Sequence, residues 1–180
     1  MSGIDIISGL LRSYLQPAAT PAADAAGHFD QVSAAVPGSV LSQGITAAFE
    51  SPQTPPFHDM VTQLFTNSDP AQRAAMLTTL LNAIPAEQRA ALANSLGVSL
   101  PSPGATTTTG TATAPVISAS QAQQVSPAAV TQAAEQAAAI NPSIVGQLGT
   151  FYAQHPTLVK TLGSLAMIVA MRKIARHYPS

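Results

Sequence analysis

The chain has 180 residues, of which 8% are charged, and its formal net charge is −1 at pH 7. It contains no cysteine, which excludes disulfides, thiolate metal sites and cysteine nucleophiles. The near-neutral balance argues against a protein that binds nucleic acid over its whole surface. Alanine accounts for 34 residues, so we expect a core rich in alanine and poor in aromatic side chains.

Helix-start signals recur through the chain. In each, a small polar residue precedes proline at the start of an apolar-periodic run. The pairs are Thr20-Pro21, Thr54-Pro55, Asp69-Pro70, Ser126-Pro127 and Asn141-Pro142, with His155-Pro156 as a weaker sixth case. The polar side chain can accept a hydrogen bond from the first helical turn, and proline at the first position lacks only a donor that is unpaired there anyway. Runs with strand-like alternation are absent from the sequence, so we predict an all-α fold.

Six helices are predicted before residue 98. They cover residues 3–16, 21–35, 37–49, 55–65, 70–83 and 85–96. The first has Ser2 as its expected cap and an apolar stripe at i, i+3, i+4 spacing. Its polar face carries Asp5, Ser8 and Arg12 rather than a basic array, which favours a core-facing helix over a membrane-interface helix. Gly97 is suited to end the sixth helix.

Residues 99–117 are expected to form a linker. The segment from Pro101 to Pro115 is rich in threonine, alanine and proline and has no charge and almost no large side chain, so little offsets the entropy of ordering it. The alternative is a long loop inside one domain, but structureless loops of that length are uncommon. We therefore predict an N-terminal domain over 1–98 and a C-terminal domain over 118–180. Whether these domains pack on each other stays open.

The C-terminal domain begins with a short glutamine-rich turn at Ser118. Three helices are predicted to follow, over 127–140, 142–154 and 156–177. The last is apolar on almost all sides, and a small helical unit can cover only part of such a surface. It therefore needs a further partner, which can be the N-terminal domain, another copy of the chain or a membrane surface. Ala166 and Ala170 provide a small-residue face that lets another helix approach closely.

Charge is distributed unevenly along the chain. Residues 1–159 contain all eight acids against three arginines, whereas residues 160–180 contain four basic residues and no acid. A basic, apolar helix can lie on anionic lipid. Basic residues in a last helical turn also complement the helix dipole, and for so short a cluster this interpretation is favoured. Nucleic-acid binding by the same residues is disfavoured, because they lack an aromatic stacking platform.

Enzyme chemistry has little support in the sequence. The four histidines, His28, His58, His155 and His177, fall on different predicted helices or at their ends. No metalloprotease motif, Asp-rich metal loop or glycine-rich phosphate loop is present in the sequence. A Ser-His-Asp site can assemble in space from distant residues, but nothing in the sequence points to one. We expect a protein that is not an enzyme, with no catalytic residues, no metal site and no cofactor.

Two short stretches carry a family resemblance. The start Gly3-Ile-Asp-Ile-Ile-Ser-Gly-Leu-Leu11 and the helix entry Ser126-Pro-Ala-Ala-Val130, in a charge-poor helical chain, resemble bacterial YidB-like proteins. The resemblance implies a small helical bacterial protein of uncharacterised function and no site residues. The Thr-rich linker and the basic last helix depart from that pattern.

The leading functional hypothesis is a structural or interaction protein that self-associates through its last helix. The expected partner is another copy of the chain, in a homo-oligomer, or a different protein. The residues expected to make this contact are Leu162, Leu165, Ala166, Val169, Ala170 and Lys173. The alternative is a protein bound to an anionic membrane surface. Its lipid contacts would be Met167, Ile168, Met171, Arg172, Lys173 and Arg176. The N-terminus lacks the pattern of a secretion signal and no stretch is long and apolar enough to span a bilayer, so a cytoplasmic protein is expected.

Overall fold

Helices form all the regular secondary structure in the residues that the computed structural model describes, which are 3–16, 24–100 and 116–177. The predicted all-α fold is confirmed. The first part of the chain contributes α1 (Gly3–Leu15), α2 (Ala25–Ala35), α3 (Gly38–Phe49), α4 (Phe57–Asn67), α5 (Pro70–Asn82) and α6 (Ala86–Leu96). The second part contributes α7 (Ala119–Gln124), α8 (Pro127–Ile140), α9 (Ile144–Ala153), α10 (Pro156–Val159), the 3₁₀ helix η2 (Lys160–Leu162) and α11 (Ser164–His177).

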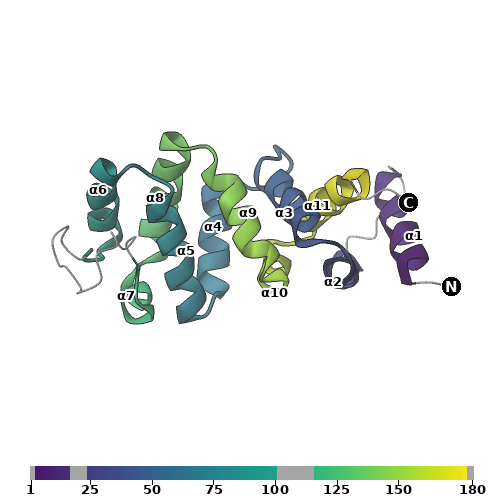
Figure 1. Ribbon diagram of the computed structural model, residues 1–180, viewed down its shortest axis with the longest axis horizontal. Helices are drawn as coiled ribbons and strands as arrows, with labels where there is room; N and C mark the ends of the chain where they lie inside the picture. The colour runs from purple at the N-terminus through teal and green to yellow at the C-terminus, as the bar shows by residue number, and fades with distance from the viewer. Residues whose placement is uncertain (1–2, 17–23, 101–115, 178–180) are drawn as a thin grey trace, which may run out of the picture.

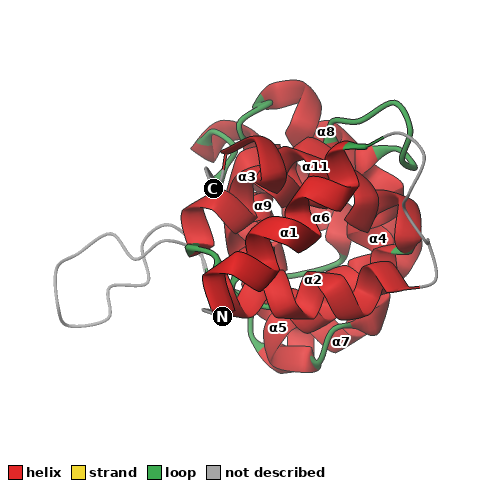
Figure 2. Cartoon of the chain, turned by 90° about the vertical axis from the view of Figure 1, so that its right-hand side faces the viewer, coloured by secondary structure: helices red, strands yellow, loops and turns green. Residues whose placement is uncertain are grey.

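The chain runs along an elongated array of helices and then returns (Figure 1). Helices α1 and α2 lie at the end that carries both termini, α6 lies at the opposite end, and α7 to α11 lead back. The returning helices pack against the outgoing ones: α7 against α5, α8 against α4 and α6, α9 against α3, and α11 against α3, α2 and α1. Figure 2 looks onto the end with the termini and shows α1 lying across it.

The two parts of the chain share one core. Their buried apolar residues form a single continuous cluster. Hydrogen bonds join the parts at widely separated points, including Lys160 to Asp30 at 2.7 Å, Asn141 to the Ala83 carbonyl at 2.7 Å, and Thr62 to Thr131 at 2.7 Å. The predicted domains 1–98 and 118–180 therefore pack on each other along their length, and the described residues contain one core rather than two. Short, alanine-rich helices bury little area each, so they gain by packing against several neighbours.

Two predicted helix starts are confirmed together with their capping mechanism. At α5, a carboxylate oxygen of Asp69 accepts a hydrogen bond from the backbone N–H of Gln72 at 2.8 Å, and the Gln72 side chain accepts one from the Asp69 N–H. At α8, the Ser126 hydroxyl accepts from the Ala129 N–H at 3.2 Å. Proline occupies the first turn in both helices. These starts are local in origin, which is why the sequence predicts them.

Other starts lie later than predicted. Helix α4 begins at Phe57 rather than Pro55, because the Thr54 hydroxyl donates to the Ala48 carbonyl at 2.5 Å instead of capping the next helix. Helix α9 begins at Ile144, after a turn in which the Asn141 side chain accepts from the Ser143 N–H. The predicted cap Ser2 and the pair Thr20-Pro21 lie outside the described residues.

The predicted helix over 156–177 is interrupted at Gly163. This residue has φ 88° and ψ 168°, a conformation that glycine adopts readily and other residues adopt at a cost. Before it, α10 tightens into η2, and α11 begins only at Ser164. The apolar periodicity of the sequence does not reveal the break at Gly163, because apolar residues continue on both sides of it. As a result α11 has its own direction and packs on α3.

Helix α3 lies in unusually close contact with two helices of the second part. A β-carbon added at Gly44 would lie 2.6 Å from Cγ1 of Ile174 and 2.9 Å from the carbonyl oxygen of Ala170, both on α11. A β-carbon added at Gly149 of α9 would overlap Oγ1 of Thr46 on α3. Thr46 and Gly44 are two residues apart on a helix and so face opposite sides. Of the small-residue face predicted at Ala166 and Ala170, Ala170 lies close to α3, and Ala166 is buried as well.

Substituting Gly44→Ala tests the contact between α3 and α11. The added methyl group meets a backbone carbonyl as well as the Ile174 side chain, so we expect the free energy of unfolding to fall by about 1–3 kcal/mol. Gly146→Ala is the matched control, because Gly146 is also helical but has nothing within 4 Å of an added β-carbon. The control should gain about 0.5–1 kcal/mol. Urea unfolding monitored by circular dichroism measures both, and equal effects at the two positions would contradict the close contact.

Candidate functional site: the outer face of α11

Helix α11 divides its side chains between the core and the surface. Its buried side consists of Ala166, Met167, Ala170, Met171 and Ile174. The opposite side forms a stripe that we term the outer face, made of Leu165, Val169, Arg172 and Arg176, which follow one another at intervals of four, three and four residues. Leu165 is 58% exposed, a high value for a large apolar side chain. The outer face is therefore apolar at the start of the helix and basic towards its end.

The structure separates the six residues predicted for self-association. Leu165 is exposed, and Val169 and Lys173 are half-buried. The other three, which are Leu162, Ala166 and Ala170, are buried against helices of the same chain. In this fold a second molecule can reach Leu165, Val169 and Lys173, whereas the buried three serve intramolecular packing.

The residues predicted for membrane contact are also divided. Met167 and Met171 are 3% and 0% exposed, so these side chains are not available to a lipid surface. Ile168, Arg172 and Lys173 are half-buried and Arg176 is exposed. Among the described helices, none combines the length and apolar character needed to cross a membrane.

Basic side chains of the second part make different contacts. The Nε of Arg172 donates to the carbonyl oxygen of Tyr14 at 3.3 Å, close to the C-terminal end of α1 where helix carbonyls lack partners. Lys160 forms an ion pair with Asp30 at 2.7 Å. Within the part of the chain that the structure describes, neither Lys173 nor Arg176 has a carboxylate partner. The end of α11 therefore carries two basic side chains, Lys173 and Arg176, without an ion-pair partner in the described residues.

The histidines lie in separate places. Nδ1 of His28 is 2.8 Å from the Tyr14 hydroxyl, His58 lies 3.8 Å from Asp59, and Nδ1 of His155 is 3.5 Å from the Gln72 amide. Each of these contacts joins a histidine to a neighbouring helix or to the next residue in the chain. None of the three contacts joins one histidine to another. Across the described ranges, no group of three or more His, Asp or Glu side chains is placed to hold a metal ion.

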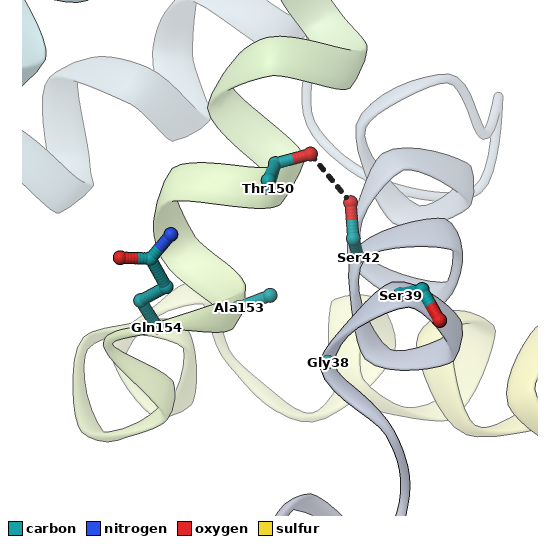
Figure 3. Close-up of a pocket in the computed structure, with 6 residues that line it drawn as sticks. All are labelled: Gly38, Ser39, Ser42, Thr150, Ala153 and Gln154. Carbon is teal, nitrogen blue, oxygen red and sulfur yellow. Dashed lines mark hydrogen bonds between the residues drawn. The ribbon is translucent and has the colours of Figure 1, made fainter.

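An open cavity of about 380 Å³ lies between the start of α3 and the end of α9 (Figure 3). Its lining consists of Gly38, Ser39, Ser42, Thr150, Ala153 and Gln154. Ser42 and Thr150 point toward each other across it, with 2.9 Å between their hydroxyl oxygens. None of the lining side chains titrates near neutral pH, so the cavity offers hydrogen bonds but no general acid or base. The sequence gives no signal for this cavity, because Ser42 and Thr150 are 108 residues apart.

Tyr152 is the most deeply buried titratable side chain in the described core. It is 0% exposed, and its hydroxyl donates to Sδ of Met76 at 2.7 Å. Burial raises the pKa of Tyr152 far above its ordinary value of 10.0, because the phenolate has no solvation there. The pKa of Tyr14 is also raised, first by burial and then by the charge of Asp24. Both tyrosines stay neutral in the folded protein at physiological pH.

Comparison with known proteins gives no relative: no family model, curated protein or solved structure matches the chain.

Alkaline pH should destabilise the fold through Tyr152. Above about pH 10 the unfolded chain loses a phenolic proton that the folded chain retains, so the free energy of unfolding falls by about 1.4 kcal/mol per pH unit for this tyrosine. Tyr152→Phe keeps most of the packing and should remove that share of the pH dependence. Urea unfolding of both proteins between pH 8 and about pH 11 measures the difference. Parallel pH profiles would show that Tyr152 ionises normally in the folded state.

Proposed function

We propose that this protein is a helical interaction protein, without catalytic activity, that self-associates through the outer face of α11. The observation that carries the proposal is the exposure of Leu165, at 58%, on a helix whose other large apolar side chains are buried or half-buried. Half-buried Ile168 and Val169 lie beside it and extend the apolar surface. The proposal narrows the contact expected from the sequence to the residues that a second molecule can reach.

The energetics set what such a contact requires. Burying an exposed leucine contributes about 1.5–3 kcal/mol, which is small against the cost of association. A stable interface buries roughly 1,200 Å² or more in total. Leu165 is thus an anchor, and Ile168, Val169 and the aliphatic stems of Arg172 and Lys173 supply further area.

The membrane-surface alternative is less well supported. It relies on Met167, Ile168 and Met171 as inserted side chains, and the two methionines are buried in the core. Membrane insertion of these residues would require α11 to leave the core. Self-association needs no such rearrangement, which is why we prefer it.

Replacing Leu165 with glutamate tests the proposed function. Because the side chain is exposed, Leu165→Glu should leave the fold intact while placing a charge in the contact, and the molar mass should fall to that of the monomer. Val116→Glu is the matched control, since Val116 is 65% exposed and precedes α7, away from α11. Light scattering after size exclusion, over a wide range of concentrations, measures the mass.

Two outcomes would contradict the proposal. One is an unaltered chain that stays monomeric at every concentration. The other is an assembly that Leu165→Glu and Val116→Glu affect equally. A monomer that co-sediments with anionic vesicles in a salt-dependent manner would favour the membrane alternative instead.

A further inference from the structure

Among the described residues, basic and acidic side chains that form no ion pair between a carboxylate and an arginine or lysine lie on opposite halves of this molecule. Lys173 and Arg176 of α11 have no carboxylate partner in the described structure. In the other half, the two arginines bind backbone carbonyls instead of acids. Arg73 donates to the Phe65 carbonyl at 2.9 Å, and Arg89 donates to the Leu81 carbonyl at 2.9 Å. The acids of that half therefore have no arginine partner in the described residues, and Asp59 lies 3.8 Å from Nε2 of His58.

Two of these acids flank one contact between α4 and α8. The hydroxyls of Thr62 and Thr131 lie 2.7 Å apart and bridge these helices. Asp59 precedes Thr62 by three residues and Glu135 follows Thr131 by four, so each lies about one turn from the bridge on the same helix face. The Asp59 side chain is 56% exposed and Glu135 is exposed. We term Asp59 and Glu135 the acidic flank.

The fold keeps the acidic flank away from the basic end of α11 in the same molecule. Helices α9 and α3 lie between α8 and α11 along the array (Figure 1). The single ion pair that a basic residue of η2 or α11 makes in the described residues, Lys160 to Asp30, involves α2 and not α4 or α8. Pairing between the two surfaces therefore requires two molecules.

Electrostatics also select between two ways of covering the outer face. If the outer faces of two copies met directly, Lys173 and Arg176 of each would still lack a carboxylate partner, because α11 contains no acid. Like charges placed together in an interface are unfavourable, and opposite charges favour both association and register. The acidic flank of a second copy supplies the missing carboxylates.

We propose that the outer face of α11 docks on the acidic flank of a second copy of the chain. Leu165 and Val169 supply apolar contact, while Lys173 and Arg176 face Asp59 and Glu135. This inference rests on the proposed self-association and specifies which surface of the second copy receives α11.

Charge reversal on both surfaces tests the docking. Arg176→Glu and Glu135→Lys should each raise the dissociation constant of the assembly about three- to fivefold, and the double variant should return to within about twofold of the unaltered chain. Glu87→Lys is the matched control, because Glu87 is an exposed acid on α6 outside the acidic flank. Sedimentation velocity at about 0.1 M salt measures the constants, and raising the salt should weaken the assembly.

The results distinguish this inference from the proposed function. Suppose that Leu165→Glu dissociates the assembly, but Glu135→Lys changes the dissociation constant no more than Glu87→Lys does. The outer face then takes part in association, and the acidic flank is not the surface that receives it. A double variant no tighter than the weaker single variant would also overturn the docking. If the unaltered chain does not associate at all, both proposals fail.

Discussion

The close approach of α3 to α9 on one side and to α11 on the other determines much of this structure. Both approaches depend on glycine: Gly149 admits Thr46, and Gly44 admits Ala170 and Ile174. Because α3 belongs to the first part of the chain and its two partners to the second, these contacts join the parts into one core. Protein interiors are packed so closely that a single added methyl group lowers stability. These glycine positions therefore leave little freedom in how the helices cross.

The same packing decides what α11 presents to its surroundings. Once its alanine face lies against α3, the buried methionines fix the rotation of the helix, and Leu165, Val169, Arg172 and Arg176 are left on the outside. The break at Gly163 contributes, because it separates α11 from α10 and lets α11 follow α3. The proposed function follows from this rotation. A helix that is apolar on almost all sides in sequence thus has one covered side and one available side in the fold.

The sequence predicts features that depend on neighbouring residues, and misses those that depend on distant ones. The caps Asp69 and Ser126 act within one helical turn, so their helices begin where expected. The pairing of α3 with α9 depends on alanine, serine and glycine faces that many helices of this chain share, so composition does not select the partner. For the candidate site, the sequence identifies α11 and Leu165. It cannot tell that Leu162 and Ala170 are covered by the same chain, because their cover is distant in sequence.

Native-state hydrogen exchange of the full chain tests the shared core most directly. If α3 joins the two parts, the amides of Ile45 in α3, Leu148 in α9 and Ala170 in α11 should exchange through one global opening. They should then have equal free energies of opening and the same dependence on denaturant. If Leu148 and Ala170 instead exchanged through an opening well below that of Ile45, the second part would unfold by itself. That result would contradict a single core held together by α3.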